Sequence, residues 1–240
     1  MKNDPLKKES VTAKEKDDTV KNIRSQKGYK VLDMETLMKK YDTPPKQIVE
    51  HIVVEKGATI IAGTDGVGKT WFSLQMAFCI ATGKDFIGFK TIKRPVLVIQ
   101  FELSPEQLAD RLKSFQEAFG TINQKYLDFA VLENDLIFSN AWEKVKTTVL
   151  EKGINNGVII IDNIYSSTDI DISNNQYLKP LLQKINQIRN ETRNAIVLVG
   201  HCNKTDGEEQ ILNKDMISGG KTLTNYVSNV FQIGNSSMGA

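Results

Sequence analysis

The sequence TIIAGTDGVGKTWFSLQMAF, from Thr59 to Phe78, passes from a β-branched apolar run through three glycines into a segment with helical periodicity. Residues 63–70 within it fit G-x-x-x-x-G-K-[ST] at every fixed position, and the flanks supply the strand and the helix that this pattern requires. A glycine-rich turn without a ligand is the plainer interpretation, but it does not explain the complete match. The stretch therefore predicts a phosphate-binding loop between a strand and a helix.

The residue types in this loop suit a triphosphate, which presents several anionic oxygens within a small volume. The loop must turn its amide N–H groups inward, and glycine permits the φ values that this requires, so Gly66 and Gly68 are assigned to the turn. The Lys69 ammonium is expected to reach the β- and γ-phosphates, and the Thr70 hydroxyl to bind Mg²⁺. Asp65 is an acid inside an anion site, so we expect its side chain to point outward. The predicted nucleotide contacts are Gly63, Thr64, Asp65, Gly66, Val67, Gly68, Lys69, Thr70 and Trp71.

Length and composition favour one large α/β domain, because the chain has 240 residues, of which 40% are hydrophobic. No apolar run approaches the ~20 residues of a membrane span, and the first 30 residues are too charged for the apolar core of a signal peptide. Cys79 and Cys202 lie far apart and give neither a metal-binding spacing nor a disulfide framework. We therefore expect a cytoplasmic protein with no membrane partner.

The formal net charge of +2 is unevenly distributed, since residues 1–30 hold nine Lys or Arg and five Asp or Glu. A charged segment with few large apolar residues cannot bury enough surface to offset its ordering entropy. Residues 29–42, YKVLDMETLMKKYD, predict a short helix, and Pro44 and Pro45 then break the chain. We expect residues 1–40 to form a disordered or helical tail and residues 41–240 to form the folded domain. Contact between this tail and nucleic acid is the alternative to a merely solvated tail.

Strands and helices alternate through the folded domain. The apolar runs PVLVIQF and GVIIIDN are typical of strands that helices cover on both faces. This βαβ order predicts a mainly parallel sheet with helices on both faces. The expected strands are residues 58–62, 95–101, 128–132, 157–161, 195–200 and 229–233, and the expected helices are residues 69–82, 105–119, 140–152, 176–191 and 221–227.

Two carboxylates follow buried strands of this predicted sheet. Asp162 ends one strand, and ligands of open α/β sheets gather at the carboxyl ends of strands, where an Asp can hold Mg²⁺. Glu102 follows another strand, and a base that polarises water for attack on a γ-phosphate must stand across the phosphate from the loop. A solvated loop acid remains the alternative interpretation of Glu102. Ser104 is expected to start the next helix, with Glu106 or Gln107 completing a capping box.

His201 ends a further strand, where a polar side chain can contact the γ-phosphate and respond to its loss. A satisfied surface histidine is the alternative, which spacing alone leaves open. The other histidine, His51, precedes the first strand and carries no such argument. The candidate catalytic residues are Glu102, Lys69 and His201, and the candidate metal ligands are Thr70 and Asp162.

The ordered segments GTDGVGKT, VIQFELSPEQLADR, VIIIDN, VLVGHCNK and ISGGKTLTNYVSNVFQIG together resemble an AAA family ATPase domain of the RecA-like P-loop ATPases. They are similar in particular to the branch of RepA-type and DnaB-type hexameric replicative helicases, over about residues 44–240. The resemblance implies a RecA-like fold and ATP with Mg²⁺ as cofactors. It implies Glu102 as the catalytic carboxylate, Asp162 as the metal carboxylate, and His201 with Lys204 as the region that senses the γ-phosphate.

The same resemblance implies a homo-oligomeric ring, such as a hexamer, that binds single-stranded DNA and acts in DNA replication, mobilisation or unwinding. However, the loops expected to contact a single strand, within residues 165–176 and 203–221, have no excess of bases, whereas such grooves are positive. Family members also continue into a strand with a basic residue that reaches a neighbour's nucleotide, and this sequence ends at Ala240 before one. We therefore expect slow turnover by the chain alone. The main alternative is an ATP-switched regulatory or interaction module without helicase activity.

Overall fold

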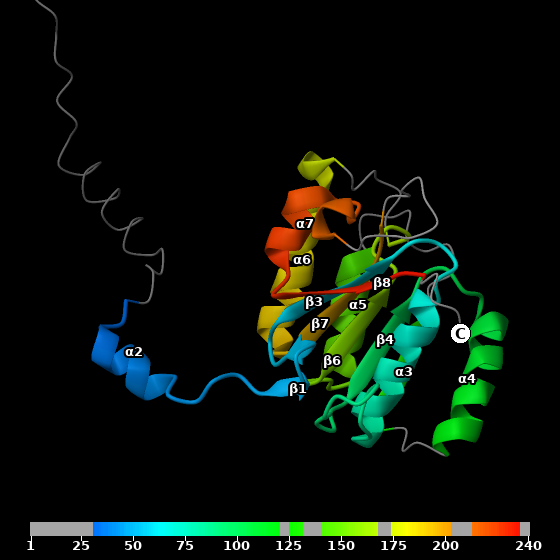
Figure 1. The fold of residues 1–240 in the computed structure, drawn as a ribbon. Helices are drawn as coiled ribbons and strands as arrows, with labels where there is room; N and C mark the ends of the chain where they lie inside the picture. Colours follow the sequence, from blue (N-terminus) through cyan, green and yellow to red (C-terminus); the bar gives the residue numbers. More distant parts are fainter. Residues whose placement is uncertain (1–30, 121–124, 132–140, 168–173, 203–212, 236–240) are drawn as a thin grey trace, which may run out of the picture. The chain divides into compact units, whose positions relative to one another are not determined.

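The computed structural model describes residues 31–120, 125–131, 141–167, 174–202 and 213–235 (Figure 1). The chain divides into two compact units, Met1–Pro44 and Pro45–Ala240. The described part of the first unit holds α2 (Met34–Lys40), which begins where the Asp33 carboxylate accepts the backbone N–H of Thr36 at 2.8 Å. This helix confirms the short helix predicted within residues 29–42. Residues 1–30 of the tail predicted for residues 1–40 lie outside the described residues, so this division of the chain stays a prediction.

The second unit is built around a six-stranded sheet in the order β5-β4-β6-β7-β3-β8, and its neighbouring strands are parallel. Each strand begins and ends within one residue of the predicted range, so the parallel α/β fold predicted from the sequence is confirmed. The strands are β3 (Ala58–Gly63), β4 (Val96–Gln100), β5 (Leu127–Val131), β6 (Val158–Asp162), β7 (Ala195–His201) and β8 (Asn229–Ile233).

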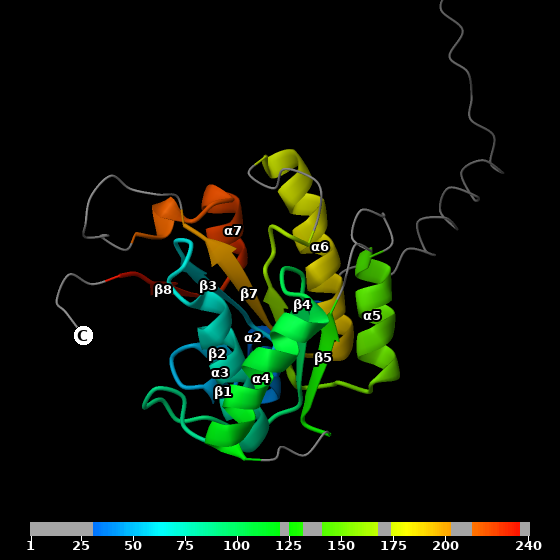
Figure 2. The ribbon, with the colours of Figure 1, turned by 90° about the vertical axis from the view of Figure 1, so that its right-hand side faces the viewer.

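Helices cover both faces of the sheet, as Figures 1 and 2 show. One face carries α3 (Lys69–Thr82) and α4 (Pro105–Phe119), and the other carries α5 (Ala141–Glu151), α6 (Asn175–Thr192) and α7 (Gly220–Tyr226). This two-sided cover explains why β4 and β6 are buried along their whole length and have continuous apolar sequences. The bounds of α3 and α4 are those that the sequence predicts.

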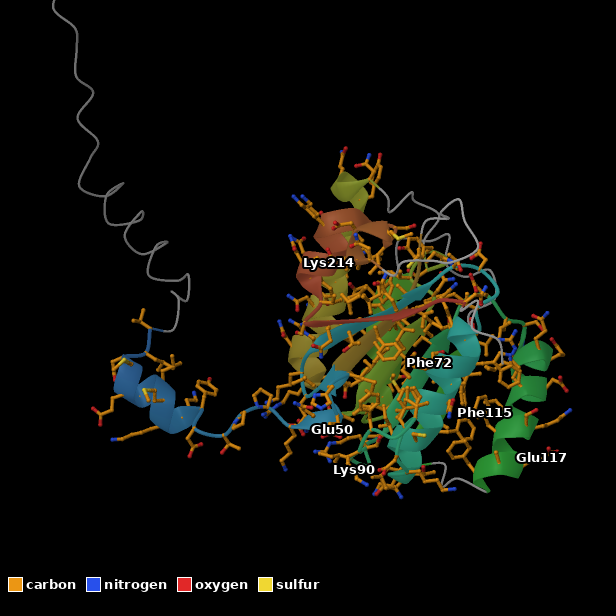
Figure 3. The ribbon with its side chains drawn as sticks, viewed as in Figure 1. Glu50, Phe72, Lys90, Phe115, Glu117 and Lys214 are labelled. Atoms are coloured by element: carbon orange, nitrogen blue, oxygen red, sulfur yellow. The ribbon has the colours of Figure 1, made fainter. Side chains whose placement is uncertain are left out.

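The hydrophobic core therefore consists of two layers, one on each face of the sheet. In the first layer, Phe115 of α4, which Figure 3 labels, stacks on Phe78 of α3, and the ring centroids are 4.9 Å apart. In the second layer, Trp142 of α5, Leu178 of α6 and Leu223 of α7 pack against the opposite face of the strands. The sheet is thus fixed from both sides, and its strand ends form a rigid platform.

A two-stranded hairpin ahead of β3 was not predicted from the sequence. In it, β1 (Gln47–Val49) and β2 (Val53–Val54) pair in the antiparallel direction. The carbonyl of Ile52 accepts the Thr59 hydroxyl at 2.6 Å and the Asn229 amide at 2.9 Å, which ties the hairpin to β3 and β8. Strands of three and two residues are too short to show a period of two in the sequence.

A capping box fixes the start of α4, just after the end of β4. The Ser104 hydroxyl accepts the Gln107 backbone N–H at 3.3 Å, and the Gln107 side chain accepts the Ser104 backbone N–H at 3.0 Å. Gln107 is therefore the partner that completes the predicted box, while the Glu106 carboxylate accepts the Ser104 hydroxyl at 2.7 Å. The cap holds the short turn between β4 and α4, which carries Glu102.

The register of the sheet brings the ends of four strands together at one edge. Gly63, at the end of β3, lies opposite His201, at the end of β7. Gln100, at the end of β4, lies opposite Asp162, at the end of β6. Because the strands are parallel, the loops that follow these four residues all leave the sheet on the same side, where open α/β sheets bind their ligands.

The buried side chain of Asn194 gives a test of this packing. It joins the connection between α5 and β6 to the connection between α6 and β7, where these two strands begin. It accepts the Gly157 N–H at 2.7 Å and donates to the Ile154 carbonyl at 2.7 Å and the Thr192 hydroxyl at 2.9 Å. We expect Asn194→Ala to lower the free energy of unfolding by about 2–4 kcal/mol, since each buried polar group left unsatisfied costs about 1–3 kcal/mol. Urea denaturation measures the change. The exposed Asn155 is the control, and a similar loss in Asn155→Ala would contradict the assignment.

Candidate active site

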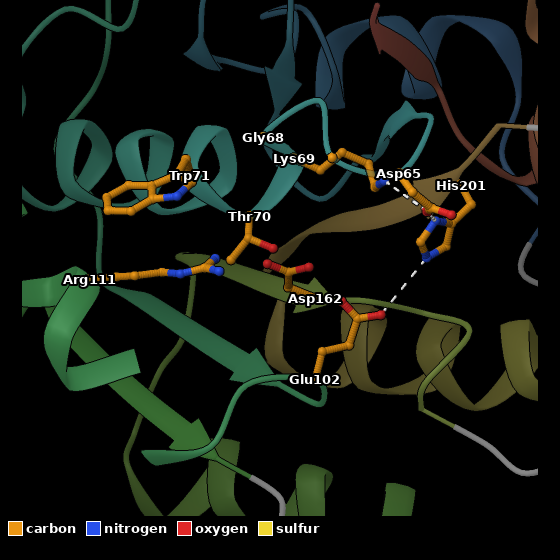
Figure 4. A pocket seen from close by; sticks show the side chains of 10 residues that line it. Asp65, Gly68, Lys69, Thr70, Trp71, Glu102, Arg111, Asp162 and His201 are labelled. Atoms are coloured by element: carbon orange, nitrogen blue, oxygen red, sulfur yellow. Dashed lines mark hydrogen bonds and ion pairs between the residues drawn. The ribbon is translucent and has the colours of Figure 1, made fainter. Parts of the chain in front are cut away.

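A cavity of about 410 Å³ lies at this edge of the sheet (Figure 4). Its walls come from the loop between β3 and α3, the first turn of α3, the turn after β4, helix α4, and the ends of β6 and β7. The residues that line it are Asp65, Gly66, Gly68, Lys69, Thr70, Trp71, Glu102, Arg111, Asp162 and His201. The structure therefore brings every candidate catalytic and metal-binding residue of the sequence into one cavity.

Three glycines shape the loop between β3 and α3 for two different reasons. Gly66 and Gly68 have φ values of 79° and 87°, in the left-handed region that glycine adopts without strain. Gly63 is required by close approach instead, because a Cβ atom there would lie 2.6 Å from the carbonyl oxygen of Ile233 and 2.8 Å from a methyl group of Val67. The loop can therefore pack tightly against β8 and still turn its backbone toward the cavity.

Lys69 places a buried cation at the start of α3. Its ammonium donates to the Thr64 carbonyl at 2.8 Å and lies 3.9 Å from Oδ1 of Asp65. The N-cap of α3 is Gly68, which has no side chain to bond the amides of the first turn. The ammonium and these helical N–H groups therefore form a positive corner of the cavity, which is suited to an anion such as phosphate.

Asp65 departs from the expectation that its side chain points outward. The side chain is 69% exposed, but Oδ1 lies 2.8 Å from Nδ1 of His201 as well as near Lys69. The reason is the pairing of β3 with β7, which places His201 opposite Gly63 and so within reach of the loop. The loop acid thus faces two nitrogen-bearing side chains of the cavity.

Asp162 is a buried carboxylate, with 1% of its surface exposed. It accepts hydrogen bonds from the Ser73 hydroxyl at 3.1 Å and the Gln100 amide at 3.3 Å, and also from the Thr70 hydroxyl. Burial raises the pKa of Asp162 above its ordinary value of 3.8, and the nearby Glu102 carboxylate adds to this, while the hydrogen bonds partly oppose it. A nearby cation would stabilise the ionised form of this buried carboxylate.

The oxygens of Thr70 and Asp162 fit a magnesium ion. Both are hard oxygen donors, and their hydrogen bond shows that they lie side by side. Among the described residues, no group of three or more His, Cys, Asp and Glu side chains is placed to bind a metal ion. This donor set suits Mg²⁺, which usually takes one or two protein oxygens and completes its shell with water and substrate phosphates.

Glu102 and His201 lie close to each other in the wall of the cavity. The Glu102 carboxylate accepts hydrogen bonds from the Asn163 amide and, at 3.1 Å, from the Ser166 hydroxyl. Its Oε1 lies 3.9 Å from Nε2 of His201. Glu102 is therefore a hydrogen-bonded carboxylate that lines the cavity, although its side chain is 41% exposed, and its role as the base stays a prediction.

Comparison with known proteins identifies the family of this chain. The AAA domain family matches residues 26–207. The chain belongs to the AAA domain family. Among solved structures, it is similar to the KaiC-like protein PH0186 of the hyperthermophilic archaeon Pyrococcus horikoshii OT3, with 16% sequence identity, a TM-score of 0.53, and coverage of 81% of this chain and 83% of the other. No curated protein matches this sequence.

These comparisons confirm the RecA-like P-loop ATPase predicted from the sequence, in its family and in its α/β fold. The family supports nucleotide binding and hydrolysis as the general activity of this AAA domain. The narrower prediction of a replicative helicase remains a prediction. No helix within the described ranges is long and apolar enough to cross a membrane.

Sequence reasoning missed two side chains of this AAA domain, Arg111, which lines the cavity, and Asn163, which lies behind its wall. Arg111 of α4 places its guanidinium 5.4 Å from the ring centroid of Trp71, and this ring packs on Phe115 with centroids 5.4 Å apart. Asn163 bridges Glu102 and His201. Arg111 stands in the segment on which the family resemblance rests, and Asn163 directly follows Asp162, so both carried a signal in the sequence. Lys204, predicted beside His201, lies outside the described residues.

The raised pKa of Asp162 predicts how its ionisation affects stability. The folded protein binds this proton more tightly than the unfolded chain does, so the associated stability is present at low pH and is lost as pH rises through the folded pKa. At neutral pH, without nucleotide or Mg²⁺, we therefore expect Asp162→Asn to unfold at a higher urea concentration than the wild type. The difference between the two urea midpoints should become smaller as pH falls below the pKa of Asp162 in the folded protein.

The exposed Asp110 on α4 provides the matched control for this measurement. Asp110→Asn removes the same charge from an exposed position, so its urea midpoint should follow the wild type at each pH. A lower midpoint for Asp162→Asn at neutral pH would show that its charge stabilises the ligand-free protein, contrary to our assignment.

Proposed function

We propose that this AAA domain binds ATP with Mg²⁺ in the cavity between the phosphate loop and the strand ends, and hydrolyses it to ADP and phosphate. The observation that carries the proposal is the convergence of Lys69, Thr70, Asp162 and Glu102 on one cavity. Three of these groups suit an anion and its metal, since Lys69 suits phosphate and Thr70 and Asp162 suit Mg²⁺, and Glu102 is a carboxylate that stands apart from them. A site that only bound phosphate would not require this last group.

The proposed binding step uses the loop and the start of α3. The backbone N–H groups of residues 66–70 and the Lys69 ammonium hold the β- and γ-phosphates. On binding, the ammonium exchanges its bond to the Thr64 carbonyl for phosphate oxygens. Thr70 and Asp162 hold Mg²⁺, which when bound neutralises charge that develops on the phosphate oxygens.

The proposed chemical step assigns Glu102 as the general base. A water molecule between Glu102 and the γ-phosphate gives a proton to the carboxylate as its oxygen bonds to phosphorus, and the bond to the bridging oxygen of ADP breaks. The hydrogen bonds from Asn163 and Ser166 hold the carboxylate in place for this role. His201 is assigned to the γ-phosphate, with which its ring can form a hydrogen bond.

The Trp71 ring and the Arg111 guanidinium give a surface on which we propose that the nucleotide base lies. Trp71 is 43% exposed although its indole packs against Phe115, so one part of the ring is left free for a planar ligand. Stacking does not by itself distinguish adenine from guanine, because every base has a π-face. The preference for ATP is carried by the family resemblance.

For the biological role, we propose coupling of ATP hydrolysis to DNA replication, mobilisation or unwinding by a homo-oligomeric ring, as the resemblance to hexameric helicases suggests. One observation favours a second candidate, an ATP-switched interaction module. The sequences of the loops expected at a DNA channel, residues 165–176 and 203–221, have no excess of bases. A channel for single strands is expected to be positive.

Measurement of ATPase rate with and without single-stranded DNA distinguishes these two roles. Stimulation by DNA that survives deletion of residues 1–30 would support the helicase-linked role. DNA binding that is lost on this deletion would place the contacts in the basic tail, and we expect such binding to weaken strongly as salt rises. No stimulation by DNA, together with ATP-dependent capture of a protein partner, would favour the switch.

Lys69→Ala tests the binding site. It removes a buried cation from the cradle, and loss of a charged hydrogen bond costs about 1.5–3 kcal/mol, so ATP affinity should fall at least about tenfold. Isothermal titration calorimetry measures this affinity. Lys90→Ala removes an exposed lysine paired with Asp85 and should leave ATP affinity unchanged. Equal ATP affinity in wild type and Lys69→Ala would refute the proposed site.

Glu102→Gln separates chemistry from binding. The amide keeps the shape of the side chain but cannot accept a proton from water, so turnover should fall by about 10²–10⁴, the usual contribution of a positioned base. The dissociation constant for ATP should change little, because Glu102 is not assigned as a phosphate or metal ligand. Glu117→Gln, on the exposed surface of α4, is the matched control. Parallel loss of affinity and turnover would show that Glu102 has another role.

A further inference from the structure

Asn163 is a buried amide that connects the two candidate catalytic side chains. It has 1% of its surface exposed and lies directly after Asp162. The backbone N–H of Ser166 donates to its Oδ1 at 2.8 Å, and its Nδ2 donates to the Glu102 carboxylate. A backbone N–H can only donate and an ionised carboxylate can only accept, so both partners require the same orientation of the amide.

This orientation also determines which nitrogen of His201 carries the proton. Nε2 of His201 lies 3.0 Å from Nδ2 of Asn163, which can only donate, so Nε2 must present a lone pair. On the other side of the ring, Nδ1 lies 2.8 Å from the carboxylate of Asp65, which can only accept, so Nδ1 carries the proton. Two independent neighbours thus require the same neutral tautomer.

We infer that Asn163 is a positioning residue that holds His201 in its Nδ1–H tautomer and Glu102 in its place. Asp65, His201, Asn163 and Glu102 then form one hydrogen-bonded chain from the phosphate loop to the candidate base. The opposite tautomer would set a donor against the Asn163 amide and a lone pair against the Asp65 carboxylate. The geometry of these hydrogen bonds does not depend on the proposed function, whereas their consequence for catalysis rests on it.

The consequence concerns the terminal phosphate of a nucleoside triphosphate. The Nδ1–H of His201 points to the loop side of the cavity, where Asp65 accepts it. A γ-phosphate oxygen is also an anionic acceptor, and we assign it to replace Asp65 at this proton when the nucleotide binds. The ring is joined to Glu102 through Asn163. A change of the hydrogen-bond acceptor at Nδ1, from Asp65 to a phosphate oxygen, can therefore alter the position of the Glu102 carboxylate.

The tautomer can be observed directly in the wild-type chain. The sequence has two histidines, so long-range ¹H–¹⁵N correlation spectra of His-labelled protein contain two ring systems, and His51→Gln assigns them. At a pH where the ring is neutral, we expect protonated Nδ1 and unprotonated Nε2 for His201. A ring protonated at Nε2 in the folded wild type would overturn the inference without the need for any variant of Asn163.

Substitutions of Asn163 test whether this residue sets the tautomer. Asn163→Ala removes the donor, so His201 should become a mixture of tautomers, and Asn163→Asp replaces the donor by an acceptor, so Nε2 should become protonated. Ser166→Ala is the matched control, because it removes the other hydrogen bond to Glu102 and keeps the backbone N–H that orients Asn163. Its His201 spectrum should match the wild type. An unchanged His201 spectrum in both folded Asn163 variants would overturn the inference.

Kinetics separate this positioning role from a general loss of structure. For Asn163→Ala we expect turnover to fall by about tenfold to a hundredfold, the usual effect of removing a partner that orients an active-site group. The dissociation constant for a non-hydrolysable ATP analogue should change less than about threefold, since Asn163 is not assigned as a ligand. Equal losses in turnover and binding would contradict positioning. If the wild type shows the expected tautomer but binds no nucleotide, the proposed function fails and the tautomer assignment stands.

Discussion

The parallel pairing of β3 with β7 and of β4 with β6 is the constraint on which the rest of the site depends. It sets Gly63 opposite His201 and Gln100 opposite Asp162, so groups distant in the sequence meet at one edge. Both faces of the sheet are covered by helices, which leaves its strand ends as the place where polar side chains can gather. A shift of either pair by one residue would turn these side chains to the other face.

This arrangement concentrates charge in a place that is partly closed to water. Asp162 and Lys69 are both buried, and buried charges are tolerated only where hydrogen bonds or opposite charges compensate them. Ser73, Gln100 and Thr70 supply the bonds for Asp162, and the Thr64 carbonyl supplies one for Lys69. The ligand-free site is thus held together by contacts within the chain that the proposed ligands would partly replace.

Much of the fold could be predicted because its signals are local. The runs around β4 and β6, the glycine loop and the caps of α3 and α4 each carry their information within a few neighbouring residues. The hairpin of β1 and β2 escaped prediction because its strands are too short to show a pattern. The contact between Asp65 and His201 escaped it for another reason, since it joins residues 136 positions apart through the register of the sheet. Asn163 was visible in the sequence, but its role depends on the orientation of its amide, which only its three-dimensional partners define.

The placement of the two tryptophans gives this molecule its own optical reporter. Trp71 lies half exposed at the wall of the cavity, in contact with Arg111, whereas Trp142 is buried in the core layer on the opposite face of the sheet. A change of surroundings at the cavity would alter the emission of the first indole and leave the second in its apolar setting. The chain therefore contains both a signal and an internal reference, and occupancy of its cavity can be followed by intrinsic fluorescence without any attached dye.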